Sequence, residues 1–249
     1  MPTGATAWRG FLALAAMLLA APVPAAERPV VIELFTSQGC SSCPPADALI
    51  RDIVRERRDV VALSFPVDIW DYIGWKDTLA KPEFTARQKH YAQSRGDHQV
   101  YTPQIVVDGT AHGVGSDKQQ LAALVESTAG ARRDLGASMK ISEADGMVIV
   151  DLGAASGDIG QGAGVWLLRV SRSKSVAIGR GENGGRQLTY TNIVRSIVRM
   201  GQWMGMASRF EMPIPEVRTD DADGYVVIVQ RAWGDVIGPI LAAGKSNGL

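Results

Sequence analysis

The sequence has few cysteines and no net charge, and both features exclude whole classes of protein. Two cysteines in 249 residues cannot form the framework of a small disulfide-rich scaffold. The 26 Lys and Arg residues are balanced by 26 Asp and Glu residues, and no sustained basic run occurs, so we expect no nucleic-acid partner. The hydrophobic fraction of 46% excludes wholesale disorder. The length allows one large domain or two small ones.

The first segment, residues 1–26, has the layout of a secretory signal peptide. Arg9 gives it a positively charged N-terminal region, Phe11 to Ala21 is an unbroken apolar run, and the small residues Ala25-Ala26 follow. This run is short for a membrane-spanning helix, which needs about 20 apolar residues, and no later stretch is apolar enough. We therefore expect a periplasmic or secreted protein without stable membrane insertion after cleavage. An uncleaved membrane anchor is the alternative.

The segment 27–132 has the alternating pattern of an α/β domain. Short apolar runs and turn residues predict strands at 29–35, 60–65, 102–109 and 111–114. Proline and capping signals predict helices that begin at 44–45, near 82 and at 116–117. The first two strands are joined by one helix and should be parallel, with a right-handed crossover.

The segment 133–249 has the pattern of an all-β, sandwich-like domain. Short strands separated by turn residues are predicted at 139–142, 147–152, 165–170, 175–178 and 225–230. Residues 191–203 fit either a helix or a strand, and we favour a strand. Residues 179–184 spell G-x-G-x-x-G but lack the βαβ context of a dinucleotide site, so a polar turn is expected there.

The chemistry of the sequence centres on Cys40-Ser41-Ser42-Cys43, between the first predicted strand and the following helix. Cys40 precedes a helix N-terminus, where unpaired N–H groups and the helix dipole favour a thiolate. Only a thiolate attacks disulfides, so Cys40 would attack and Cys43 would resolve the mixed disulfide.

Two other interpretations of the cysteine pair stay open. A structural disulfide across so short a loop would contribute only about 2 kcal/mol by the loop-entropy formula. A copper or zinc carrier would add His98 or His112 to Cys40 and Cys43, but these residues form no recognisable ligand pattern. We therefore expect neither a cofactor nor a bound metal.

Thr102-Pro103 enters a predicted strand 60 residues after Cys43. With the Cys-x-x-Cys pair, this makes residues 29–129 resemble a thioredoxin-like domain. The resemblance implies a cis proline at Pro103, whose loop holds the substrate backbone with Thr102 at its edge. It also implies a buried carboxylate that takes the proton of Cys43, and Glu33 is the expected residue. An outward-facing glutamate near the sheet edge is the alternative.

Several stretches are similar to an exported bacterial family known only as a domain of unknown function: 33–47, 68–77, 101–104 and 181–190. That family usually reads His-Val-Asp-Tyr-Trp where this chain has Pro66-Val-Asp-Ile-Trp70, so a histidine there is missing. Trp70 and Trp75 either line a substrate groove or pack a long loop onto the domain.

These features predict an α/β thioredoxin-like domain followed by an all-β domain. The expected activity is thiol–disulfide exchange with exported protein thiols or small thiols and an unknown redox partner. The main alternative is a binding module in which the thioredoxin scaffold is not catalytic, because a fold does not determine a function.

Overall fold

The structure is a computed structural model that describes residues 1, 28–131, 136–233 and 236–249. Nearly all of the predicted signal peptide, and most of the boundary predicted between the two domains, lie outside the described residues. Among the described residues, no helix has the length and hydrophobicity to cross a membrane.

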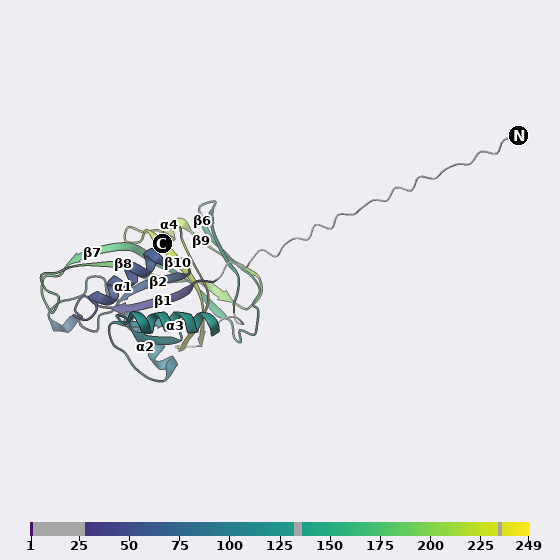
Figure 1. Ribbon diagram of the computed structural model, residues 1–249. Coiled ribbons are helices and arrows are strands. Elements are labelled where there is room, and N and C mark those ends of the chain that lie inside the picture. The colour runs from purple at the N-terminus through teal and green to yellow at the C-terminus, as the bar shows by residue number, and fades with distance from the viewer. Residues whose placement is uncertain (2–27, 132–135, 234–235) are drawn as a thin grey trace.

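Helices and strands alternate in the first half of the chain (Figure 1). Its elements are β1 (Val30–Thr36), α1 (Pro44–Glu56), β2 (Val60–Pro66), the short 3₁₀ helix η1 (Asp71–Ile73), α2 (Pro82–Arg95), β3 (Gln104–Val107), β4 (Ala111–Val114) and α3 (Lys118–Ala131). The second half is almost entirely strands. They are β5 (Met139–Ala144), β6 (Met147–Leu152), β7 (Ala163–Ala177), β8 (Gln187–Trp203), β9 (Ser208–Pro213), β10 (Gly224–Trp233) and β11 (Val236–Lys245), with the one-turn helix α4 (Ile214–Val217) after β9.

Eight strands form one mixed sheet in the order β11-β10-β7-β8-β2-β1-β3-β4. As expected, β1 pairs with β2 in parallel. On its other side, β1 pairs with β3 in the antiparallel sense. Every residue of β1 and β2 is buried, because both faces of this part of the sheet are covered.

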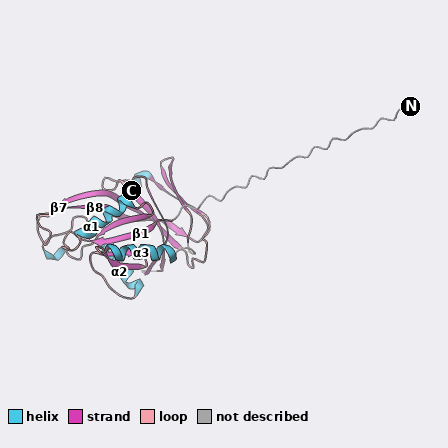
Figure 2. Cartoon of the chain, in the orientation of Figure 1, coloured by secondary structure: helices cyan, strands magenta, loops and turns pink. Residues whose placement is uncertain are grey.

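The helices divide between the two faces of the sheet (Figure 2). Successive side chains of a strand point to opposite faces. In β1, Ile32 and Leu34 pack with apolar residues of α1 and α3. Val31 and Phe35 pack instead with Phe84 of α2 and its neighbours. The face that each β1 side chain occupies therefore decides which helix it meets.

The second half of the chain differs from the separate sandwich-like domain that we expected. Its strands β7, β8, β10 and β11 extend the sheet of the first half, because β8 pairs with β2 at Ile193 and Ser64. The remaining strands form a three-stranded sheet, β5-β6-β9, that packs on β7, β10 and β11 through a second apolar cluster. Sequence alternation indicates which face of a strand is buried, but it does not indicate the neighbouring strand.

Individual strands of the second half were largely placed correctly. The ambiguous segment 191–203 lies in β8, which confirms the strand interpretation. The predicted strand at 175–178 is instead the end of the long strand β7. Strands β9 and β11 were not predicted. β7 and β8 form a hairpin whose tip, residues 178–186, extends to the first half of the chain.

Candidate functional site

Cys40 and Cys43 are joined in a disulfide at the N-terminus of α1, with their Cα atoms 5.4 Å apart. Cys43 occupies the N-cap, and two prolines follow it in the first turn, where a missing N–H leaves no hydrogen bond unmade. The Cys40 residue is 5% exposed and Cys43 is fully buried, whereas Ser41 and Ser42 between them are exposed. Any reagent that attacks this disulfide must therefore reach Cys40 first.

The turn before Cys40 is held in place by the segment that follows β2. The backbone N–H of Gln38 donates to Asp77 Oδ2 at 2.8 Å, and Trp75 Nε1 donates to Gln38 Oε1 at 2.8 Å. A Cβ atom at Gly39 would lie 3.1 Å from the Cβ of Trp70, so glycine permits a close approach of that tryptophan. The segment from 70 to 77 thus fixes the conformation of the loop that carries Cys40.

The peptide bond between Thr102 and Pro103 is cis, as the resemblance implied. Trp70 Nε1 donates to Thr102 Oγ1 at 2.7 Å, which links this loop to the segment after β2. A Cβ atom built at Gly115 would lie 3.1 Å from the Pro103 Cβ and 3.2 Å from the Ala46 Cβ. Pro103 therefore lies beside the first turn of α1, close to the disulfide.

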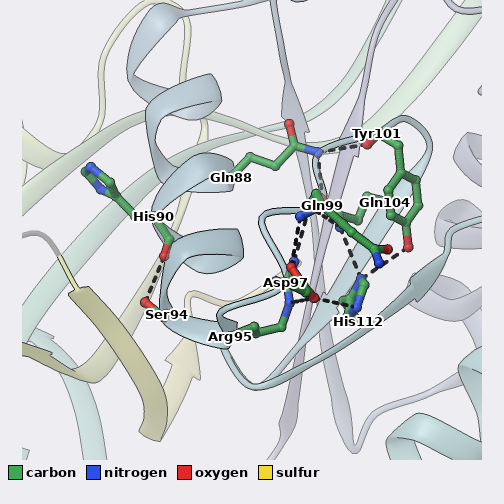
Figure 3. A network of polar contacts seen from close by, with 9 residues as sticks. All are labelled: Gln88, His90, Ser94, Arg95, Asp97, Gln99, Tyr101, Gln104 and His112. Carbon is green, nitrogen blue, oxygen red and sulfur yellow. Dashed lines mark hydrogen bonds and ion pairs between the residues drawn. The ribbon is translucent and has the colours of Figure 1, made fainter.

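A polar network holds the residues that flank Thr102-Pro103 (Figure 3). His112 Nδ1 lies 3.2 Å from Tyr101 Oη and 3.2 Å from Gln104 Nε2, and His112 Nε2 lies 3.1 Å from Asp97 Oδ2. Burial lowers the pKa of His112, and the nearby Arg95 lowers it further. A neutral imidazole donates from Nε2 to Asp97 and leaves Nδ1 as an acceptor that Tyr101 and Gln104 share. His112 thus holds the residues on both sides of Thr102-Pro103.

Behind the disulfide lies a buried acid, Asp47, that we did not predict. It follows Cys43 by one helical turn, and helical side chains lean toward the N-terminus, so its carboxyl group leans toward Cys43. Asp47 Oδ1 accepts a hydrogen bond from Thr36 Oγ1 at 2.9 Å, and Oδ2 has no partner among the described residues. Burial raises the pKa of Asp47 to about 7, and the charge of Asp77 adds to this rise, whereas the Thr36 bond opposes it.

Two further acidic groups lie near Asp47. Burial raises the pKa of Asp77 to about 6, although this carboxylate accepts hydrogen bonds from three backbone N–H groups. Burial also raises the pKa of the Tyr190 hydroxyl, as do the charges of Asp47 and Asp77. One buried region beside α1 therefore contains three acidic groups whose pKa values are raised, and that of Asp47 lies nearest neutrality.

The structure corrects the position that we expected for Glu33. This side chain faces α2 together with Val31, so it lies on the other face of the sheet from α1. It is fully buried, and its Oε1 atom lies 2.8 Å from Arg87 Nη2, which also donates to Tyr91 and Gln230. Glu33 is neither behind Cys43 nor at an exposed edge; it belongs to a buried ion pair.

The tip of the β7–β8 hairpin contacts the loop that carries Cys40. This contact was not predicted from the sequence. Asn183 Nδ2 donates to the carbonyl oxygens of Gln38 and Cys40, at 3.0 and 2.9 Å. Glu182 Oε2 accepts a hydrogen bond from the backbone N–H of Ser41 at 3.1 Å. The G-x-G-x-x-G stretch is the polar turn that we predicted, but only the family resemblance over 181–190 hinted that it has a role.

The tryptophans that the sequence analysis singled out form hydrogen bonds with the loops around the disulfide. Trp70 and Trp75 are half-buried and donate the hydrogen bonds described above. Their part in a substrate groove stays a prediction. Among the described residues, no group of three or more His, Cys, Asp or Glu side chains could hold a metal ion, so neither His98 nor His112 joins the cysteines in such a group there.

Comparisons with known proteins place this arrangement in a family. Residues 31–230 match the family described as protein of unknown function (DUF1223). The chain belongs to this family. The crystal structure of protein AGR_C_4864 from Agrobacterium tumefaciens is similar, with 32% sequence identity and a TM-score of 0.74, over 88% of this chain and 94% of that one.

A second solved structure shares the fold alone. HBP35 of Porphyromonas gingivalis has a TM-score of 0.58 and 15% identity, over 88% of this chain and 75% of that one. No curated protein is detectably similar to this chain. The DUF1223 match spans the disulfide, the Pro103 loop and the hairpin tip, so the two halves that build the site belong to one family unit.

Proposed function

We propose that this member of the DUF1223 family is an exported thiol–disulfide oxidoreductase whose first half is a thioredoxin-like domain. The observation that carries the proposal is the disulfide at the N-terminus of α1 with the buried acid Asp47 one turn behind it. The strand order β2-β1-β3-β4 and the cis Pro103 beside the first turn of α1 support it. The predicted signal peptide supports a periplasmic or secreted location.

In the proposed reaction, a substrate thiolate attacks the sulfur of Cys40 and the bond between Cys40 and Cys43 breaks. A mixed disulfide forms, and Cys43 leaves with the electron pair as a thiolate. Asp47 gives its proton to that thiolate and later takes up a proton from solvent. A second substrate thiolate then attacks the substrate sulfur of the mixed disulfide and releases Cys40. Two electrons have passed from the substrate dithiol to the protein, and the reverse sequence reduces a substrate disulfide.

Asp47 suits both directions because its pKa is raised to about 7, so near neutral pH the group can give or take a proton. Thr102 and Pro103 would hold the substrate backbone beside Cys40, with Trp70 supporting Thr102. Exported protein thiols and small thiols are the proposed substrates, and they approach Cys40 from the exposed side of Ser41 and Ser42.

Trapping the mixed disulfide tests this proposal. Cys43→Ser removes the resolving thiol, so we expect it to accumulate mixed disulfides with exported proteins or small thiols in the cells that make the protein. Cys40→Ser is the matched control and should accumulate none. Non-reducing gels and mass spectrometry measure both, and thermal melts verify that each variant is folded. A folded Cys43→Ser variant that traps nothing would overturn the proposal.

One observation favours a second candidate, a non-catalytic binding module. The disulfide is almost completely buried, with Cys40 only 5% exposed, as a structural disulfide would be. Such a module would trap no partner through Cys43→Ser and would keep its binding activity when both cysteines are replaced by alanine.

A further inference from the structure

The tip of the β7–β8 hairpin is a turn with its own hydrogen bonds. The N–H of Ile178 donates to the carbonyl of Arg186 at 2.8 Å, and the N–H of Gly185 donates to the carbonyl of Ile178 at 2.8 Å. These bonds close the turn at its base. The tip is therefore held in a defined shape before it meets the loop that carries the cysteines.

Asn183 attaches this tip to the cysteine loop. Its side chain is fully buried, its two amide hydrogens go to the carbonyls of Gln38 and Cys40, and its Oδ1 atom accepts from Arg186 Nη1 at 3.0 Å. Each polar atom of the amide thus has a partner. Because a buried amide with all its partners fixes its surroundings, Asn183 also fixes the position of the residue before it, Glu182.

Glu182 places a negative charge next to the cysteines. Its Oε2 atom accepts a hydrogen bond from the backbone N–H of Ser41, the residue that follows Cys40. Hydrogen bonding from Ser41 lowers the pKa of Glu182, so the carboxylate is ionised at neutral pH. Among the described residues Glu182 has no ion pair, and Arg186 on the same turn bonds to Asn183.

We propose that Glu182 lowers the reduction potential of the Cys40–Cys43 pair and so makes the disulfide harder to reduce. This inference rests on the proposed function and names a residue from the second half of the chain that tunes the site. Reduction creates a Cys40 thiolate beside Ser41, and a carboxylate next to that position disfavours the new negative charge. Glu182 also occupies the Ser41 N–H, a donor that the thiolate could otherwise use.

The experiment is a redox equilibrium in glutathione buffers, in which the protein disulfide and two glutathione molecules exchange with the protein dithiol and one glutathione disulfide. Glu182→Gln keeps an oxygen that accepts the Ser41 N–H but removes the charge. We expect the equilibrium constant for reduction to rise about three- to tenfold, which corresponds to a potential about 15–30 mV higher. The pKa of the Cys40 thiol in the reduced protein should fall by about half a unit to one unit.

Two controls isolate the charge next to Ser41. Glu56→Gln makes the same charge change at the exposed C-terminal end of α1, and it should leave the potential and the thiol pKa unchanged. High salt should shrink the difference between Glu182→Gln and the unaltered protein, because about 1 M salt screens charges beyond about 3 Å.

The outcomes separate this inference from the proposed function. A pair that equilibrates with glutathione, but has the same potential in Glu182→Gln as in the unaltered protein, would overturn the inference and leave the function standing. A pair that is too stable to be reduced by glutathione would count against the function. The two proteins would then be compared in dithiothreitol buffers, where equal potentials would overturn the inference and a higher potential in Glu182→Gln would support it.

Discussion

Two carboxylates are buried on opposite sides of the same sheet, and they have opposite surroundings. Glu33 faces α2 and lies 2.8 Å from the guanidinium of Arg87, with Tyr91 and Gln230 completing the network. Asp47 lies on α1, accepts one hydrogen bond from a hydroxyl group and meets no cation among the described residues. The first carboxylate has a cation within hydrogen-bond distance, whereas burial of the second favours the protonated form.

This difference separates a structural acid from one that can move a proton. A buried charge with a partner is costly to disturb, because removing one partner leaves an uncompensated ion. A buried carboxyl group with a pKa near neutrality can gain or lose its proton at little cost, and such groups cluster at functional sites. We therefore expect the acid on the α2 face to contribute to stability, whereas proton transfer on the α1 face, next to the disulfide, belongs to the proposed function.

The largest expected effect comes from breaking the ion pair. Arg87→Met should lower the free energy of unfolding by about 3–5 kcal/mol, because Glu33 stays buried without its cation. Urea denaturation measures the loss. Adding Glu33→Gln to this variant removes the unpaired charge and should restore most of the stability. A potential of the Cys40–Cys43 pair that moves with Arg87→Met would contradict the separation of the two faces.

The next effect is a pH dependence of stability that belongs to Asp47. Its pKa is raised to about 7 in the folded protein, against about 3.9 in an unfolded chain. The folded state therefore binds the proton more tightly. This contribution is fully present below about pH 4 and is lost as the pH rises through 7, by about 4 kcal/mol at most. Asp77, with its pKa raised to about 6, contributes in the same direction.

Asp47→Asn should remove the part of the pH-dependent loss of stability that Asp47 causes. Urea denaturation of the variant and the unaltered protein at about pH 4 and about pH 8 measures it, because the stability of the variant relative to the unaltered protein should increase with pH. Equal pH dependence in the two proteins would mean that Asp47 does not hold a proton in the folded state.

A smaller effect is expected on the rate of exchange. Asp47→Asn should slow the reaction with a small dithiol at neutral pH by about 100-fold, the low end of what a positioned proton-transfer group contributes. Stopped-flow measurements over a range of pH give the rate, and the step near the pKa of Asp47 should disappear in the variant. Arg87→Met serves as the control, since its folded form should keep the rate and the step.

Local structure followed from the sequence, whereas contacts between distant segments did not. The apolar runs of β1 and β2 and the proline-led starts of α1 and α2 are local signals, and the structure has these elements where they were expected. Alternation along β1 also places Glu33 and Thr36 on opposite faces. What the sequence does not contain is which face α1 covers, and this is why Glu33 was expected behind Cys43 and Asp47 was not recognised.

The hairpin tip illustrates the same limit over a longer range. Asn183 and Glu182 lie more than 140 residues from the cysteine loop that they contact. Their local sequence is typical of any polar turn, so residue patterns alone gave no reason to connect them with Cys40. The pairing of β8 with β2 brings the second half of the chain to the site, and this pairing depends on how the whole sheet assembles.

The reduction potential of the Cys40–Cys43 pair tests the central claim most directly. Equilibration of the mature protein in glutathione and dithiothreitol buffers, followed by alkylation and mass spectrometry, gives the value. The proposed activity predicts a potential between about −120 and −270 mV, the range of known thiol–disulfide catalysts. A value well below about −300 mV would identify a structural disulfide and contradict the account.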